Sequence, residues 1–83
     1  MKITVKATGL YARALPEDRE GNIATIEVPE GAGPLDILAQ LGLAPDGSYL
    51  MVLNGQTLPK SARSDTMLSE GDQLAIMPPL KGG

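Results

Sequence analysis

The chain has 83 residues, no Cys, no His and a net charge of −3, which indicates one small acidic domain. Without Cys there is no disulfide and no thiolate nucleophile, and without His the commonest general base and metal ligand is missing. The seven Lys and Arg are scattered along the chain, which argues against nucleic-acid binding. No apolar run is long enough for a membrane span and no signal-peptide core follows Met1, so we expect a soluble cytoplasmic protein.

Two strands are expected before the first proline-rich segment. Residues 2–8 alternate apolar and polar side chains, and so do residues 22–28, with β-branched residues in both. The residues between them, 9–21, carry Pro16 and a run of charges and are expected to form a long loop. The two strands should therefore pair in an antiparallel manner.

One short helix is expected over residues 34–41. Pro34 suits the first helical position, and Asp36 in the first turn complements the helix dipole. Gly42 is expected to end the helix in the left-handed conformation, with Leu43 folding back on the last turn. Because the helix is only about two turns long, it must be stabilised mainly by packing its apolar face on a sheet.

The second half of the chain is expected to add three strands, over residues 49–53, 56–58 and 73–77. Asn54-Gly55 between the first two is the strongest short hairpin signal. In the connecting loop, Met67 and Leu68 are expected to plug the core. The order β-β-α-β-β-β predicts an α+β fold with one helix across one face of a mixed sheet.

The sequence offers few groups for catalysis. It has no nucleophile-base set and no phosphate-binding loop, and the G-x-G in "EGAGPLD" lacks the third glycine of a dinucleotide site. Asp65, Glu70 and Asp72 lie close in sequence but do not have calcium-loop spacing, so we expect solvated carboxylates and no metal site. A self-contained active site is therefore not expected, and the chain is interpreted as a non-enzyme.

The chain ends with "PPLKGG", and its terminal carboxylate is the remaining reactive group. A partner enzyme could convert this carboxylate to an acyl-adenylate, which a nucleophile can attack. Two glycines without Cβ atoms suit a narrow channel, and two prolines would hold the base of the tail extended. We therefore expect a domain over residues 1–77 and a tail over 78–83. An idle, frayed end is the alternative.

The element order, the Asn-Gly turn and the ending "EGDQLAIMPPLKGG" together resemble the ubiquitin-like β-grasp sulfur carriers of the MoaD and ThiS families. The acidic-Gly-Asp turn, apolar strand, Pro-Pro and Gly-Gly are most similar to the small subunit of molybdopterin synthase, MoaD. ThiS proteins share the Gly-Gly but usually lack the Pro-Pro. The chain departs from the MoaD pattern in having no Phe in its first strand and Ile76-Met77 where aromatic residues are usual.

The resemblance implies a mechanism that uses no side-chain nucleophile. An E1-like adenylyltransferase of the MoeB/ThiF type would adenylate the Gly83 carboxylate with ATP, and a sulfur donor would convert it to a thiocarboxylate. The carrier itself would bind no cofactor. A MoaE-like large synthase subunit would hold the sulfur acceptor in molybdenum or tungsten cofactor biosynthesis. The tail residues that enter the partner would be Pro78, Pro79, Leu80, Lys81 and Gly82.

The resemblance also implies an apolar docking patch near the tail, at positions that match Leu58 and Met77. Three other functions stay open: a ThiS-like carrier for thiamine biosynthesis, a ubiquitin-like modifier conjugated to lysines through Gly83, and an interaction module with an idle tail. The free protein is expected to be a monomer, because a carrier must present its tail to its enzymes.

Overall fold

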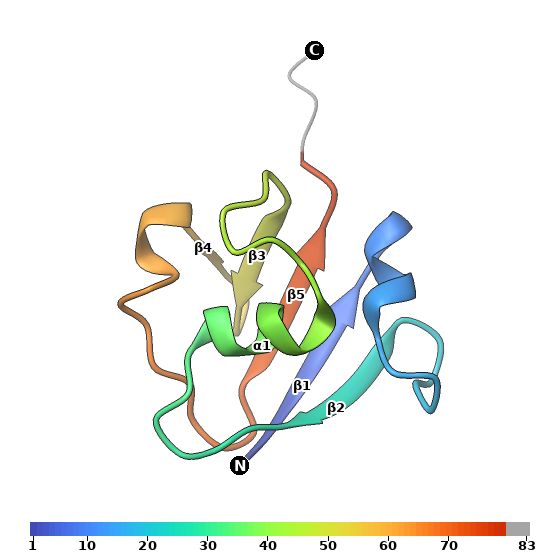
Figure 1. The fold of residues 1–83 in the computed structure, drawn as a ribbon, viewed down its shortest axis with the longest axis horizontal. Helices are drawn as coiled ribbons and strands as arrows, with labels where there is room; N and C mark the ends of the chain where they lie inside the picture. The colour runs from blue at the N-terminus through green and yellow to red at the C-terminus, as the bar shows by residue number, and fades with distance from the viewer. Residues whose placement is uncertain (80–83) are drawn as a thin grey trace.

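The computed structural model describes residues 1–79 and contains a five-stranded mixed sheet with one α-helix packed across it (Figure 1). The elements in chain order are β1 (Lys2–Ala7), η1 (Gly9–Ala14), β2 (Ile23–Glu27), α1 (Pro34–Leu41), β3 (Leu50–Leu53), β4 (Gln56–Leu58), η2 (Lys60–Ala62) and β5 (Gln73–Met77). The strand order across the sheet is β2-β1-β5-β3-β4. The expected α+β fold, with the order β-β-α-β-β-β, is confirmed.

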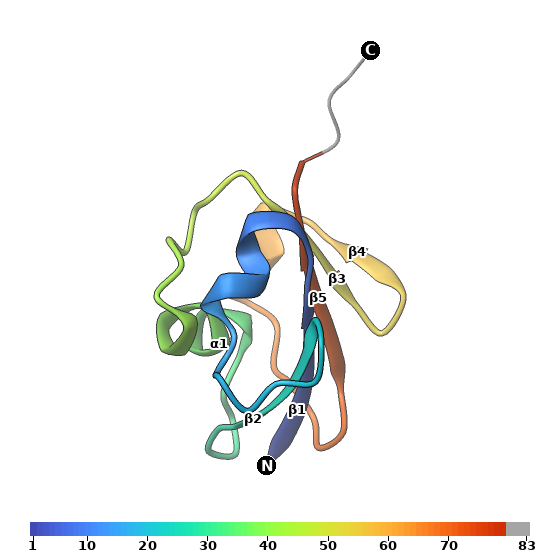
Figure 2. The same cartoon turned by 90° about the vertical axis from the view of Figure 1, so that its right-hand side faces the viewer.

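The centre of the sheet is a parallel pair, β1 and β5, formed by the two ends of the described chain. β2 pairs with β1 in an antiparallel manner, and β3 pairs antiparallel with both β5 and β4. Seen from the side, α1 and η1 cover one face of the sheet and leave the other without a helix (Figure 2). We call this second side the open face. The parallel pairing of β1 and β5 carries the end of β5 to the opposite end of the sheet from Met1 (Figure 1).

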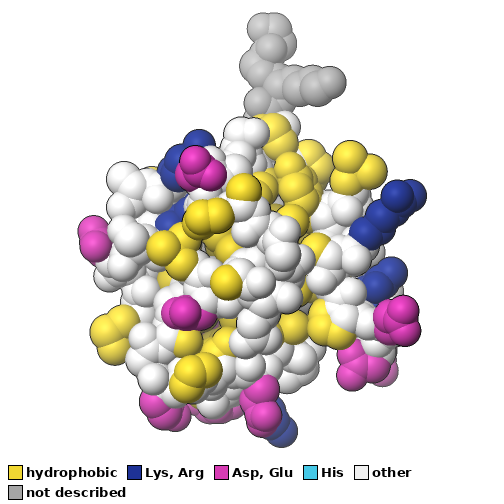
Figure 3. Space-filling model, viewed as in Figure 1, with side chains coloured by type: hydrophobic (Ala, Val, Ile, Leu, Met, Phe, Trp, Pro, Cys, Tyr) yellow, Lys and Arg dark blue, Asp and Glu magenta, His cyan; other side chains and the backbone are white. Residues whose placement is uncertain are grey.

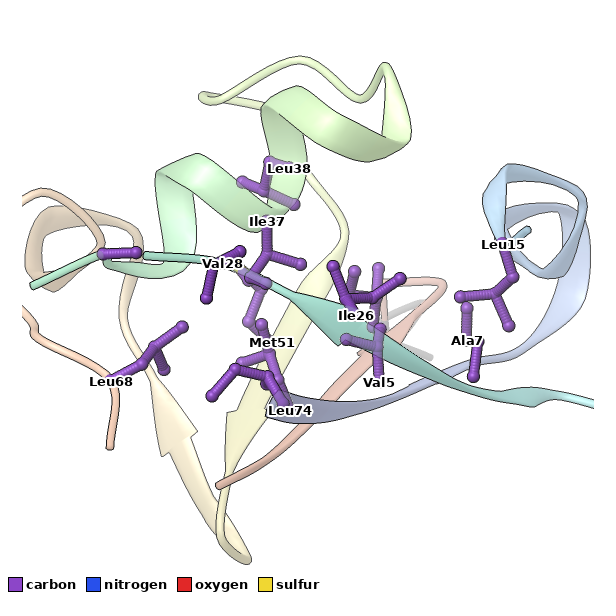
Figure 4. Packing of buried hydrophobic residues seen from close by; sticks show 14 of the residues in the cluster. Val5, Ala7, Leu15, Ile26, Val28, Ile37, Leu38, Met51, Leu68 and Leu74 are labelled. Atoms are coloured by element: carbon purple, nitrogen blue, oxygen red, sulfur yellow. The ribbon is translucent and has the colours of Figure 1, made fainter. Parts of the chain in front are cut away.

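The core lies between α1 and the sheet and is aliphatic apart from Tyr49. Figure 4 shows Ile37 of α1 pointing toward the strands that carry Met51 and Leu74. Leu38, the next residue of the helix, is also part of this core. Alternation along the strands supplies the other half of this core, since every second residue faces the helix. Burial of a side chain of this size contributes roughly 1.5–3 kcal/mol, which is how so short a helix is stabilised.

The helix ends as expected. Gly42 has φ of +74°, and the amide of Leu43 donates to the Leu38 carbonyl at 2.9 Å, which is the bond that closes a Schellman motif. At the other end, the Gly33 amide donates to Oδ2 of Asp36 at 2.8 Å. The Asn54-Gly55 turn between β3 and β4 is also confirmed, with both residues at positive φ as a type I′ turn requires.

Two expectations about the loops were wrong in part. Residues 9–21 contain the 3-10 helix η1, which places Leu15 in the core. Leu68 is buried as expected, but Met67 is 71% exposed. The Leu68 amide donates to the Ala32 carbonyl, which fixes this segment in the core, and the side chain of the preceding residue points outward.

Candidate functional site

The candidate site is the end of β5, where the described chain leaves the sheet. Ile76 is the last core residue of the strand, and its carbonyl accepts a 3.0 Å hydrogen bond from the Thr8 amide. Pro78 and Pro79 follow β5 directly and are exposed. Neither proline has an N–H, so the strand ladder cannot continue past Met77.

Four of the predicted tail residues, Leu80, Lys81, Gly82 and Gly83, lie outside the described residues. The roles assigned to them, to the Gly83 carboxylate and to a separate tail over 78–83 stay predictions. The described chain nevertheless brings its end to an exposed edge of the domain. Figure 3 shows apolar side chains at the surface beside this edge, on the helix-bearing side. Leu10 in η1 is among the exposed apolar residues, with 76% of its surface accessible.

The open face carries one row of side chains that crosses all five strands. The pairing registers place Ile23, Lys6, Ala75, Val52 and Thr57 side by side in this row. Ala75, the smallest of them, lies on the central strand and forms the floor of a shallow hollow whose rim includes Lys6 and Val52.

The structure does not place the two predicted docking residues on one face of the sheet. Leu58 pairs with Met51, which points into the core, whereas Met77 pairs with Leu50, the next residue along β3. Successive strand residues point to opposite faces, so Leu58 packs against the core while Met77 lies on the open face. Both residues lie at the end of the sheet where the chain leaves it, and their docking role stays a prediction.

Arg63 is a residue that sequence reasoning missed. It is only 3% exposed, and its guanidinium donates to three backbone carbonyls, those of Pro45, Gly47 and Tyr49, at 2.9, 3.0 and 2.9 Å. These carbonyls belong to the loop that joins α1 to β3. No signal in the sequence marks this role, because Arg63 stands in a polar loop segment and its acceptors are main-chain groups.

Tyr49 lies under this guanidinium and is held by several contacts. Its hydroxyl donates to the Ala44 carbonyl, and its ring meets that of Tyr11 edge-on at a centroid distance of 5.3 Å. Burial raises the pKa of the Tyr49 hydroxyl above its usual range, and the positive charge of Arg63 opposes part of that rise. These contacts hold the loop between α1 and β3 in place beside the site.

The described chain offers no metal site and no membrane helix. Within residues 1–79, no group of three or more Asp and Glu side chains is placed to hold a metal ion. Two of the loop carboxylates instead accept backbone hydrogen bonds, Glu70 from the Lys2 amide and Asp72 from the Ser69 amide. In the same range, no helix has the length and apolar character needed to cross a bilayer.

A five-stranded mixed sheet covered by one helix, with the last central strand leading to the chain end, defines a ubiquitin-like β-grasp protein. The model of the ThiS family matches residues 14–83, and the chain belongs to this family of ubiquitin-like sulfur carriers. The match runs through the last residue of the chain. No curated protein matches the sequence.

Three solved structures show how widely this fold is shared. Thiamine biosynthesis protein ThiS from Geobacter metallireducens is 23% identical, with all of both chains covered and a TM-score of 0.67. SAMP1 from Haloferax volcanii is 20% identical, also with all of both chains covered and a TM-score of 0.68. A chain of the complex of subunits 1 and 2 of molybdopterin-converting factor from Helicobacter pylori is 25% identical, with complete coverage of both chains and a TM-score of 0.58.

Proposed function

We propose that this protein is a sulfur carrier that works through its C-terminal carboxylate. The observation that carries the proposal is the ThiS-family match, which extends to Gly83 in a chain that contains neither Cys nor His. A carrier of this kind needs no side-chain nucleophile, because the reacting atoms are those of the terminal carboxylate. The position of Pro78 and Pro79, exposed at the end of a central strand, supports the presentation of that terminus to a partner.

The proposed chemistry has two steps, both carried out by partners. In an E1-like adenylyltransferase of the MoeB/ThiF type, a Gly83 carboxylate oxygen attacks the α-phosphorus of ATP, and pyrophosphate leaves. Hydrosulfide released by a sulfur donor then attacks the acyl carbon, the bond from that carbon to the AMP oxygen breaks, and AMP leaves, which gives a thiocarboxylate. ATP and the sulfur donor are substrates of the partner, and the carrier itself holds no cofactor.

Among the pathways open to such a carrier, we favour the delivery of sulfur to a molybdopterin precursor. The ending "EGDQLAIMPPLKGG" supports this choice, because it has the Pro-Pro that resembles the small subunit of molybdopterin synthase. The similarity to a chain of a two-subunit molybdopterin-converting factor adds support for a MoaE-like partner that holds the acceptor. In this role the chain is the sulfur-donating subunit of a synthase and is not an enzyme by itself.

Two other functions are possible for a C-terminus that is activated in the same way. Similarity to a ThiS protein favours a carrier for thiamine biosynthesis. Similarity to SAMP1, a small archaeal modifier protein, favours a protein modifier, which would be joined to lysine amines. All three share the adenylation step. The two carriers then share the sulfur nucleophile and differ in the molecule that accepts the sulfur, whereas the modifier is attacked by a lysine amine. They are therefore distinguished by product and not by fold.

Intact mass spectrometry tests the proposal directly. The protein is purified without a C-terminal tag and incubated with an E1-like enzyme, ATP and a sulfur donor. We expect a species heavier by the replacement of one oxygen with sulfur, localised to Gly83 by fragmentation. An unmodified mass under these conditions would contradict the carrier function. Conjugates on lysines of added proteins would favour the modifier instead.

A further inference from the structure

The corner between β1 and η1 lies against the base of the tail. Thr8 donates its amide to the Ile76 carbonyl, which is the last hydrogen bond between this corner and β5. Gly9 follows at once, with φ of +62°, and begins η1. Pro78 lies on the other side of this corner, immediately beyond the end of β5.

The ring of Pro78 occupies the space that a side chain at position 9 would need. A Cβ built on Gly9 would lie 2.9 Å from Cγ and 3.5 Å from Cδ of Pro78. The first distance is shorter than real Cβ contacts allow, so any side chain here must displace the ring or the corner. Pro78 has no amide hydrogen and cannot donate a hydrogen bond to β1. Its position beside β1 therefore depends on the packing of its ring against Gly9.

We propose that Gly9 is a positioning residue for the C-terminal tail. Because Gly9 has no Cβ, the Pro78 ring can pack against the corner between β1 and η1. This packing fixes the direction in which the chain leaves the sheet. Proline has a fixed φ, so the position of its ring constrains the path of the next residue. The four residues beyond Pro79 reach at most about 14 Å, and a swing of about 10° at their base would move a fully extended end by roughly 2 Å.

This inference has a part that rests on the proposed function and a part that does not. The contact itself concerns only the path of the chain and holds whatever the terminus does. If the terminus is adenylated as proposed, a displacement of this size is large for a reacting atom, since a shift of about 1 Å can lower a rate by a factor of about 10².

The path of the tail can be measured with a spin label. The chain has no Cys, so Lys81→Cys provides a single site for a nitroxide, and the broadening of backbone amide signals by NMR reports where the label lies. Gly9→Ala should change the set of broadened amides. Gly21→Ala is the matched control, because Gly21 has nearly the same φ, +61°, with no atom within 4 Å of its Cβ position.

Pro78→Ala removes the ring atoms that a side chain at position 9 would meet, which gives a double-mutant cycle. In the Pro78→Ala protein, adding Gly9→Ala should alter the broadening no more than Gly21→Ala does. Gly9→Asn serves as a second variant if Gly9→Ala does not fold, because Asn tolerates positive φ while it still places a Cβ against Pro78. Unchanged broadening in both Gly9 variants would overturn the proposal, and so would an equal effect in the presence and absence of the Pro78 ring.

Pyrophosphate exchange with an E1-like enzyme supplies the second readout. We expect Gly9→Ala to lower kcat by roughly tenfold or more with a smaller change in KM, since the substitution leaves Leu58 and Met77, the predicted docking residues, unchanged. Exchange by Gly21→Ala should equal that of the unchanged protein. If the unchanged protein shows no exchange, the proposed function fails, and the spin-label result still decides the role of Gly9. Normal kcat in a variant whose tail has moved would refute the catalytic consequence.

Discussion

The guanidinium carbon of Arg63 lies 4.7 Å from the ring centroid of Tyr49, and the same side chain donates a 2.9 Å hydrogen bond to the Tyr49 carbonyl. The cation is thus bound to both the ring and the main chain of one residue. Its other hydrogen bonds go to carbonyls of the loop before Tyr49. The positive charge is balanced by carbonyl dipoles and an aromatic face, and the loop from α1 to β3 is fixed by one side chain.

Arg63→Met should therefore lower the free energy of unfolding by about 2–3 kcal/mol, because three loop carbonyls lose a charged donor. Arg63→Lys should lose less, since an ammonium keeps the charge but cannot reach all three acceptors in the same planar geometry. Urea denaturation followed by circular dichroism measures both. Arg13→Met, at an exposed position in η1, is the control and should change stability by no more than about 0.5 kcal/mol. Equal stability of the Arg63→Met and Arg13→Met proteins would contradict this role.

The raised pKa of Tyr49 predicts a loss of stability in alkaline solution. Burial favours the neutral hydroxyl in the folded state, so its contribution is fully present below the unfolded pKa, about 10. It is lost as pH rises through the higher folded-state pKa. Tyr49→Phe cannot ionise, and it also loses the hydrogen bond to the Ala44 carbonyl, which is worth about 1 kcal/mol.

The free energies of unfolding of the Tyr49 and Tyr49→Phe proteins should therefore converge as the pH rises above 10. The two proteins differ only at position 49, so the difference between the two curves isolates Tyr49. Urea unfolding at a series of pH values measures it. Curves that stay parallel through this range would show that the folded state does not favour the neutral hydroxyl.

Local signals in the sequence were sufficient for most of the fold. The helix from Pro34 to Leu41, its cap at Gly42 and the Asn54-Gly55 turn were all predictable, because each depends on residues a few positions apart. Met67 was not, because whether it or Leu68 enters the core depends on a hydrogen bond to Ala32, more than thirty residues away. Local patterns do not contain that pairing.

Only the residues of the tail could be predicted from the sequence, and not the contacts that surround the base of the tail. The terminal glycines and the two prolines can be read directly from the chain. The placement of Leu58 and Met77 on opposite faces requires the strand register, and the contact of Gly9 with Pro78 requires the parallel pairing of β1 and β5. The role of Arg63 could not be predicted, because its hydrogen-bond acceptors are main-chain carbonyls, which every residue has.

Substitution of Leu58 and of Met77 by alanine should have different effects on stability and on activity, because the two residues lie on different faces of the sheet. Leu58→Ala should cost about 1–2 kcal/mol of stability, less than a fully buried leucine, because its side chain packs at the margin of the core. Met77→Ala should leave stability nearly unchanged and raise the KM for pyrophosphate exchange. Thermal unfolding and exchange kinetics on both variants test this. A larger stability loss for Met77→Ala than for Leu58→Ala would contradict the assignment of faces.

Lys6 should contribute to the choice of partner. Its neighbours in the row across the open face, Ile23 and Ala75, carry no charge, so its ammonium is available to a carboxylate on a partner. Lys6→Glu should raise the KM for the activating enzyme by roughly tenfold at low salt, and by less at high salt.

Lys2→Glu is the matched control for Lys6→Glu, because it makes the same charge change on the same strand and face. Lys2 lies at the far end of β1 from the tail and pairs with Glu27. Exchange kinetics at two ionic strengths separate the variants. An equal effect of both substitutions would show that net charge matters and that the position of Lys6 does not.

Removal of Gly82 and Gly83 should abolish adenylation and leave the fold intact. The sheet, the core and every hydrogen bond described above are formed by residues 1–79, so the truncated protein retains all of these contacts. Its melting temperature should stay within a few degrees of the unchanged protein, whereas pyrophosphate exchange should be lost. Addition of one alanine after Gly83 is the companion variant, because it keeps both glycines and moves the carboxylate by one residue. Loss of exchange in both variants with unchanged melting would assign the chemistry to the terminal carboxylate at its native position. A large drop in melting temperature on truncation would instead mean that the terminal glycines stabilise the domain, and the tail would then have a structural role.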